Sequence, residues 1–340
     1  MDSLTQVRLT RELIDIDSTT GREGDAGAWL ARTLETLGFK VVRQDIGGGR
    51  FNVVAAAGSP AVVFSTHFDC VPPFVPSREK DGVLYGRGSC DAKGTLVAQI
   101  TAAVRLRAAG APPVGLLFVV GEERGSEGAK AANTIAPGSK FLVNGEPTDN
   151  TLASATRGVY RAKLRASGRA AHSSRPDLGE SAIDKIVDAL VALRSADWPD
   201  SADMGRTFFT TGLINGGVAP NVVSPSAEAE IMFRTVGDFA DVRREIEARA
   251  GRFVTVEDVL VVPPVRLKTL DGFETRSFAF TTDIPFLDKW GTPLLLGPGS
   301  VTVAHTDDEH IPIAELHRAV DLYERLALTL AKSHHGGHEG

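Results

Sequence analysis

The sequence has few of the features that mark exported or membrane-spanning proteins. Two cysteines, Cys70 and Cys90, are too few for a disulfide framework in a chain of 340 residues. The longest apolar runs, such as 114–120, fall well short of the ~20 residues that a membrane span needs. Residues 1–18 carry interspersed charges and lack the apolar core of a signal peptide. These absences predict a cytoplasmic protein without a membrane partner.

An excess of positive charge is also missing. The chain has 37 Lys and Arg against 43 Asp and Glu, which gives a formal net charge of -6. A nucleic-acid binder needs a basic face to neutralise phosphates, so we exclude nucleic acid as a partner. Hydrophobic residues make up 42% of the chain, enough to build packed cores, and its length suits two domains of ~100 to 200 residues each.

Strands alternate with helices in the first part of the chain and again near its end. The apolar spacing predicts strands at 39–42, 53–56, 61–65, 114–120 and 141–143, and helices at 26–37, 95–109 and 315–331. Such alternation is typical of an α/β layer architecture with a mixed, largely parallel sheet. We assign residues 1–155 and 265–331 to this domain, and we expect the His- and Gly-containing tail, 332–340, to be disordered.

The middle of the chain has a different order of elements. Between residues 156 and 264 the pattern predicts strands at 159–166, 207–214, 227–234 and 253–262, and helices at 181–194 and 238–250. This βαββαβ order is that of a small two-layer domain. We therefore expect a second domain, 156–264, inserted into the first.

Histidines outside the tail are few enough to be informative. His67 follows an expected strand, and Asp69, two residues later, can face the same side of an extended chain. A carboxylate beside a ligating histidine fixes its tautomer in metal sites, although an ordinary hydrogen-bonded histidine at a strand end is the alternative. His317, on the helix face that it shares with Asp321 and Glu324, is predicted to be a solvated surface residue.

Carboxylates follow other expected strands. Glu122 and Glu123 come directly after the longest apolar run, where they repel each other unless a cation or an exposed turn accommodates them. Glu146 follows the next expected strand. Asp91 lies in a glycine-rich loop just before a helix, where an N-cap is the alternative.

His305 ends a short apolar run, 301–304, that we expect to be a further strand of this kind. In open α/β sheets, ligands gather outside the carboxyl ends of the strands, so these strand ends are expected to meet at one site. A dinuclear zinc hydrolase needs one histidine and one terminal carboxylate for each metal, and one shared carboxylate. A spare carboxylate can take a proton from water, and Glu122 and Glu123 are the candidates for that role.

Together these motifs resemble those of the dinuclear zinc amidohydrolase and metallopeptidase family that includes acetylornithine deacetylase, succinyl-diaminopimelate desuccinylase, aminoacylase and glutamate carboxypeptidase. The resemblance covers nearly the whole chain and implies a zinc-exopeptidase-like catalytic domain with two Zn²⁺ ions, which Co²⁺ or Mn²⁺ can replace. By resemblance, one ion is held by His67, Asp91 and Glu146, and the other by Asp91, Glu123 and His305. Asp69 would orient His67, and Glu122 would be the general base.

The inserted domain resembles the ferredoxin-like lid and dimerisation domain of the same family. Segment 168–176 matches a family segment whose histidine reaches the active site and stabilises the oxyanion, commonly across a dimer interface. In this sequence that histidine is His172, and a histidine in a surface loop is the alternative. Asn221 and Arg234 match positions that hold the substrate carboxylate, although Arg234 can equally make a structural salt bridge. The resemblance thus implies a homodimer that pairs through this domain.

Segment 296–309 is similar to the acetylornithine deacetylase branch, which has Gly-Pro-Gly before the histidine and Asp-Glu shortly after it. We therefore expect hydrolysis of the amide bond of an N-acyl-L-amino acid, of the acetylornithine, acetylcitrulline or acyl-lysine type, in arginine or lysine biosynthesis. A dipeptidase, a carboxypeptidase or a succinyl-diaminopimelate desuccinylase with the same centre is the alternative within this class.

Two other classes of function are less well supported. Thiol catalysis at Cys70 or Cys90 needs a thiolate in an electropositive site, but the neighbouring Asp69 and Asp91 would raise the pKa of a thiol. A metal-binding protein without activity would not need Glu122 as a spare base beside a full ligand set. The sequence therefore predicts an enzyme.

Overall fold

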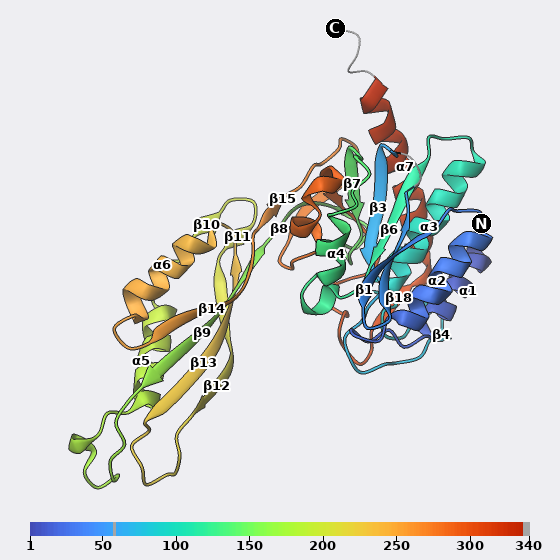
Figure 1. The fold of residues 1–340 in the computed structure, drawn as a ribbon. Helices are drawn as coiled ribbons and strands as arrows, with labels where there is room; N and C mark the ends of the chain where they lie inside the picture. The colour runs from blue at the N-terminus through green and yellow to red at the C-terminus, as the bar shows by residue number, and fades with distance from the viewer. Residues whose placement is uncertain (57–58, 336–340) are drawn as a thin grey trace. The chain divides into compact units, whose positions relative to one another are not determined.

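The computed structural model describes residues 1–56 and 59–335. The chain divides into two compact units, which Figure 1 shows in the colours of the sequence. The first unit comprises Met1–Ser154, Leu267–Arg276 and the chain from Thr282 onward, and the second comprises Ala155–Arg266 with Ser277–Thr281. The predicted domains divide at 155 and 265 and assign Ser277–Thr281 to the first domain, whereas these five residues belong to the second unit, so the domain assignment stays a prediction.

A six-stranded mixed sheet forms the centre of the first unit. In spatial order its strands are β1 (Val42–Gly47), β2 (Arg50–Ala55), β6 (Val114–Val119), β3 (Val62–His67), β7 (Phe141–Asn144) and β17 (Thr292–Leu295). The last four are parallel to one another, whereas β2 pairs antiparallel with both β1 and β6. The prediction of an α/β fold with a largely parallel sheet is therefore confirmed.

Both faces of the central strands β3, β6 and β7 are buried, which explains why these strands are largely apolar, whereas the edge strand β1 is mostly exposed. Neighbouring residues of a strand point to opposite faces. Phe64 accordingly packs in one core with α3 and α7, while Val63 packs in another with Trp290. The helices of this unit are α1 (Ser3–Ile14), α2 (Gly24–Thr36), α3 (Lys93–Ala108), α4 (Glu127–Ala132) and α7 (Ile313–His335).

Two further sheets are small. One has the strand order β18 (His310–Pro312), β5 (Val83–Tyr85) and β4 (Arg78–Lys80). The other has the order β15 (Val265–Arg266), β8 (Leu152–Thr156) and β16 (Thr275–Phe278).

Several predicted elements differ from the structure. The strand expected at 39–42 begins only at Val42, because the Phe39 N–H bonds back to the Leu34 carbonyl and continues the end of α2. The run 301–304 forms turns instead of a strand, and exposed Val301 contributes nothing to a core. α7 runs to His335, past its predicted end, while residues 336–340 of the predicted tail lie outside the described residues.

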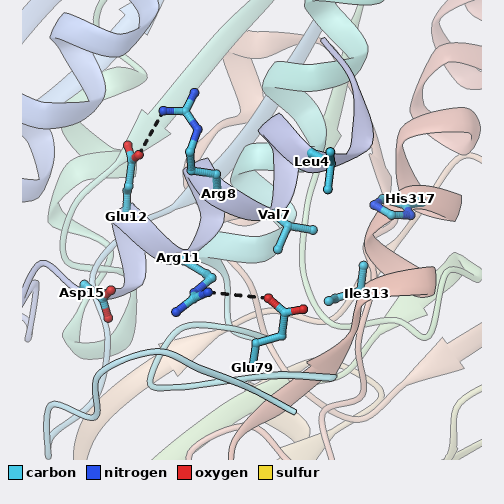
Figure 2. Close-up of a pocket in the computed structure, with 9 residues that line it drawn as sticks. All are labelled: Leu4, Val7, Arg8, Arg11, Glu12, Asp15, Glu79, Ile313 and His317. Carbon is cyan, nitrogen blue, oxygen red and sulfur yellow. Dashed lines mark hydrogen bonds and ion pairs between the residues drawn. The ribbon is translucent and has the colours of Figure 1, made fainter. Parts of the chain in front are cut away.

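His317 is not the solvated surface residue that its helix face predicts. It is half-buried, and its Nε2 atom has no hydrogen-bond partner among the residues that the structure describes. With α1 and β4 it lines a cavity of about 500 Å³ (Figure 2). Four charged residues of this cavity pair locally, Arg8 with Glu12 and Arg11 with Glu79, while Asp15 accepts hydrogen bonds from Ser77. Helix α1, which the sequence pattern did not predict, thus lies across this cavity from His317.

The second unit is an antiparallel sheet with two helices on one face. Its main elements follow in the order β9 (Gly158–Ser167), α5 (Ala182–Arg194), β12 (Phe208–Gly216), β13 (Ser226–Thr235), α6 (Phe239–Ala250) and β14 (Thr255–Val262). The sheet order is β12-β13-β9-β14, and a short pair, β10 (Asp200–Ser201) and β11 (Gly205–Arg206), stands apart. Alternate residues of β9 and β13 pack under the helices. Across both units, none of the described helices is long and apolar enough to cross a membrane.

Candidate metal centre and active site

Two groups of potential metal ligands meet at the carboxyl edge of the parallel strands in the first unit. One group consists of His67, Asp91 and Glu146, and the other of Asp91, Glu123 and His305. Within each group the ligand atoms all lie within 4.8 Å of one another. The structure therefore brings together all five residues proposed as ligands, with Asp91 common to both groups.

Strand ends supply two of the three residues of the first group, and a loop supplies Asp91. His67 is the last residue of β3, and Glu146 follows β7 by two residues. His67 Nε2 lies 3.1 Å from Asp91 Oδ1 and 3.7 Å from Glu146 Oε2. The His67 and Glu146 side chains are only 1% and 6% exposed, and Glu146 Oε1 has no hydrogen-bond partner among the described residues. A buried carboxylate oxygen without a partner is unfavourable unless a cation occupies the space beside it.

Loops and turns supply most of the second group. Glu123 lies in a short 3₁₀ helix, Glu122–Arg124, directly after β6. His305 lies in a turn with a left-handed backbone (φ 65°), and its Nε2 is 2.9 Å from Glu123 Oε1 and 3.2 Å from Asp91 Oδ2. Asp91 thus presents Oδ1 to one group and Oδ2 to the other, as a bridging carboxylate does. The His305 side chain is 48% exposed, so this group is the more open one.

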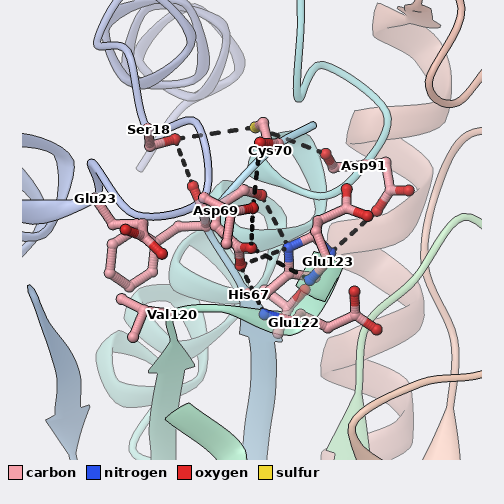
Figure 3. A network of polar contacts seen from close by, with 12 residues as sticks. Ser18, Glu23, His67, Asp69, Cys70, Asp91, Val120, Glu122 and Glu123 are labelled. Carbon is pink, nitrogen blue, oxygen red and sulfur yellow. Dashed lines mark hydrogen bonds and ion pairs between the residues drawn. The ribbon is translucent and has the colours of Figure 1, made fainter. Parts of the chain in front are cut away.

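Asp69 connects His67 with the turn that carries the two glutamates (Figure 3). His67 Nδ1 donates to the backbone carbonyl of Asp69 at 3.0 Å, and its distance to the Asp69 carboxylate is 3.5 Å. The carboxylate itself accepts the backbone N–H groups of Glu122 (3.0 Å) and Glu123 (3.2 Å) and the hydroxyl of Thr20 (2.8 Å). Asp69 is completely buried, so it fixes the glutamate turn as much as it orients the histidine.

The protonation equilibria of the centre show a surplus of buried negative charge. Burial raises the pKa of Glu146 to about 8, and it also raises the pKa of Glu123. Hydrogen bonds to Asp91 and Glu123 raise the pKa of His305 to about 10. Cations bound among these groups would relieve this repulsion and keep the carboxylates ionised. The donor set, imidazole nitrogens with carboxylate oxygens, suits zinc.

Glu122 belongs to neither ligand group. Its side chain is partly exposed, while its backbone N–H is held by Asp69. Burial raises the pKa of Glu122 well above its ordinary value, and the nearby charges of Glu146 and Asp283 add to this effect. Glu122 is therefore a carboxylate next to the centre that is free to exchange a proton.

Two buried carboxylates at this centre were not predicted as part of it. Asp283 is 1% exposed, and neither of its carboxylate oxygens has a hydrogen-bond partner in the described part of the chain. Glu309 hydrogen-bonds the backbone N–H of Asp91. No motif marks Asp283, whereas the signal for Glu309 is the adjacent acidic pair that follows His305. Its neighbour Asp308 is exposed, so the pair alone does not reveal which acid is buried.

The remaining predicted residues, His172, Asn221 and Arg234, lie in the second unit. His172 is exposed, its Nδ1 lies 2.9 Å from the Ser174 hydroxyl, and the Ser173 N–H donates to the Asn221 carbonyl nearby. Arg234, on β13, is half-buried. Its backbone pairs with neighbouring strands, but its guanidinium group makes no hydrogen bond or ion pair with the residues that the structure describes, so the salt bridge considered as its alternative role is not found among them.

The comparisons with known proteins define the class of this chain. The model of peptidase family M20/M25/M40 matches residues 63–329. A probable carboxypeptidase from Aspergillus clavatus is 37% identical over 364 residues, which cover 93% of this chain and 80% of the relative. The chain therefore belongs to the M20/M25/M40 family of peptidases.

Solved structures agree with this fold. A tripeptidase from Staphylococcus aureus superposes with a TM-score of 0.83 at 20% identity, covering 98% of this chain and 99% of that protein. A dinuclear metal-binding peptidase of the M20 family from Bacillus subtilis superposes with a TM-score of 0.73 at 15% identity, covering 97% and 98%. The broad family assignment made from the motifs is confirmed, whereas the acetylornithine deacetylase branch stays a prediction, because the similar curated relative is named a probable carboxypeptidase.

Proposed function

We propose that this protein is a metal-dependent hydrolase that cleaves the amide bond of an N-acyl-L-amino acid and releases a carboxylate and the free amino acid. The observation that carries the proposal is the pair of ligand groups that share Asp91, with the uncommitted carboxylate of Glu122 beside them. We propose two zinc ions, replaceable by Co²⁺ or Mn²⁺, one in each group. When bound, they supply Lewis-acid chemistry, which polarises the amide carbonyl and lowers the pKa of water.

Glu122 is proposed as the general base. It takes a proton from the attacking water and gives it to the leaving amine nitrogen, a task for which a carboxylate with a raised pKa is suited. Asp69 supports this step indirectly, because it holds the backbone of Glu122 and Glu123 and the ring of His67. His172 is proposed to donate a hydrogen bond to the oxyanion that develops on the carbonyl oxygen.

Arg234 is proposed to bind the substrate carboxylate. A half-buried guanidinium without an acidic partner is costly unless a ligand supplies the missing charge. Both N-acyl amino acids and peptides cleaved at their C-terminal residue offer such a carboxylate. The second candidate function is therefore a carboxypeptidase or dipeptidase with the same centre, which the name of the Aspergillus relative favours.

A substrate panel separates these functions. The panel begins with acetylornithine, acetylcitrulline and acyl-lysine, because segment 296–309 resembles the acetylornithine deacetylase branch and so favours a role in arginine or lysine biosynthesis. It is completed by dipeptides, longer peptides and succinyl-diaminopimelate. Faster turnover of peptides than of every N-acyl amino acid would favour the peptidase alternative. Replacing Arg234 by Leu should raise KM for substrates with a free carboxylate and leave KM unchanged for the matching carboxamides, which serve as the control.

The geometry of the second unit favours a homodimer as the working unit. The ladder between β9 and β13 continues past Ser226 to the bridge between His172 and Val222, whereas Arg234 lies near the other end of β13. Arg234 lies eight residues from Ser226 along β13, and eight residues of a strand span roughly 26 Å. A small N-acyl amino acid cannot reach His172 and Arg234 of the same unit, so contact with both requires two chains.

The surface of the second unit supports pairing through it. Ile183, Val187 and Val191 form an exposed apolar stripe on α5, at the i, i+4, i+8 spacing of one helix face. Strand β12 lies at the edge of its sheet. Mixing the inactive variants His172→Ala and Glu122→Gln should restore part of the activity, because a mixed dimer contains one site with both residues intact. Lack of recovery, with subunit exchange demonstrated, would contradict action across the interface.

A further inference from the structure

A buried ion pair lies directly behind the shared ligand Asp91. Glu309 Oε2 accepts a hydrogen bond from Arg87 Nη1 at 2.7 Å, and the two side chains are only 1% and 3% exposed. The other oxygen, Oε1, accepts three backbone N–H groups, from Gly88 (2.9 Å), Cys90 (3.2 Å) and Asp91 (3.0 Å). Glu309 is therefore completely engaged, and none of its contacts is with a side chain that could ligate a metal.

The pair joins the two loops that carry ligands. Arg87 Nη1 also donates to the Thr306 carbonyl at 3.0 Å, and the Gly86 N–H donates to the Glu309 carbonyl at 3.0 Å. These contacts connect the loop that ends at Asp91 with the turn that contains His305. The loop is tightly confined, because a Cβ atom on Gly88 would lie 2.7 Å from Cys70 Sγ.

The two ligand groups depend on these loops to different degrees. His67 and Glu146 sit at or just beyond the ends of strands whose pairing in the central sheet fixes their backbone. In the second group, His305 lies in a turn and Asp91 in the loop before α3, so neither is fixed by strand pairing. Convergent N–H groups around one carboxylate make a rigid anchor for such a loop. The position of Asp91 Oδ2 relative to His305 thus depends on the anchor more than the first group does.

We propose that Glu309, together with Arg87, is a positioning residue that holds the Asp91 loop against the His305 turn and so sets the affinity of the second metal group. This inference rests on the proposed two-metal function. Groups that support metal ligands from behind typically change metal affinity by roughly 10- to 100-fold when they are replaced. Loss of the anchor should therefore weaken the second metal ion by that factor. The first ion, which shares Asp91 but is also held by two residues at strand ends, should be weakened less.

The test is a stepwise titration of metal-free protein with Zn²⁺ in the presence of a competing chelator. Glu309→Gln keeps the shape of the side chain but removes its charge, and Asp308→Asn is the matched control, because Asp308 is the exposed neighbour that pairs with Arg78. We expect wild type and Asp308→Asn to bind two ions with the same affinities, and Glu309→Gln to bind one of the two ions roughly 10- to 100-fold more weakly while the affinity for the other changes less. Its activity should recover at high Zn²⁺ concentration, which a collapsed fold would not allow.

A second variant is needed if Glu309→Gln does not fold because the buried charge of Arg87 has lost its partner. Replacing both partners by apolar residues of similar size, Arg87→Met with Glu309→Leu, avoids a buried unpaired charge. It should show the same selective loss of the second ion. Unchanged affinities for both ions in a folded variant would overturn the proposal. Binding of fewer than two ions by the wild-type protein would instead contradict the two-metal function itself.

Discussion

Replacing Asp69 by Asn tests whether the glutamate turn is held in the way that the hydrogen bonds indicate. The Asp69 carboxylate is completely buried and accepts hydrogen bonds from the backbone N–H groups of Glu122 and Glu123 and from the Thr20 hydroxyl. Asn has the same shape but only one acceptor oxygen, because an NH₂ group takes the place of the other. Whichever way the amide is turned, one of the two backbone donors faces an NH₂ group.

The expected cost can be derived from these contacts. A buried donor that loses its acceptor costs about 1–3 kcal/mol. The remaining hydrogen bonds lose their charge assistance, which adds about 1 kcal/mol. We therefore expect Asp69→Asn to lower the free energy of unfolding of the metal-free protein by about 2–4 kcal/mol. Because the backbone of Glu122 loses its anchor, kcat should fall as well, by roughly 10- to 100-fold.

The measurement is urea unfolding of the metal-free protein, followed by metal titration and steady-state kinetics. Thr20→Val is the control: it removes one hydrogen bond from the same carboxylate and keeps the charge, so we expect a loss of about 1 kcal/mol with little change in kcat. If Asp69→Asn were as stable and as active as the wild-type protein, the claim that Asp69 fixes the glutamate turn would be wrong.

Three further predictions concern the same centre. Glu122→Gln should keep both metal ions and lose about 100- to 10,000-fold in kcat, whereas Glu123→Gln should lose the second ion; the opposite pattern in elemental analysis would exchange the two roles. A thiol alkylating agent should not inhibit the native protein, since Cys70 is buried and burial raises its thiol pKa to about 11; inhibition by alkylation of this residue would contradict that view. Burial raises the pKa of the Asp283 carboxyl to about 6, above its ordinary value of 3.8, so the folded metal-free protein binds this proton more tightly than the unfolded chain does. The stability that the bound proton provides is present at about pH 4 and is lost as the pH rises through 6. Asp283→Asn should then stabilise metal-free protein at pH 7 by up to about 3 kcal/mol in urea unfolding and reduce the pH dependence, whereas an unchanged dependence would exclude Asp283 as its source.

The buried parallel strands and the residues at their carboxyl ends could be predicted from the sequence. Continuous apolar runs located β3, β6 and β7, and parallel strands place their carboxyl ends along one edge of a sheet. The pattern of apolar runs therefore explains why His67, Glu123 and Glu146 come together. The assignment of ligands to particular metals depended instead on the resemblance to a known family.

Other features depend on tertiary contacts that no local pattern reports. His305 follows an apolar run but lies in a turn, because pairing partners and packing decide whether a short run becomes a strand. Glu309 stands beside an exposed acid of nearly the same chemistry, and only the fold shows that it meets three backbone N–H groups. His317 has the helical position of a surface residue, yet it lines a cavity opposite α1 and is half-buried.

Metal content and activity measured on the same sample test the central claim most directly. We predict about two zinc ions per chain in active protein, with hydrolysis of an amide substrate from the panel that is lost on treatment with a chelator and regained in proportion to added Zn²⁺. Sustained turnover by a sample in which elemental analysis finds no metal would contradict the account.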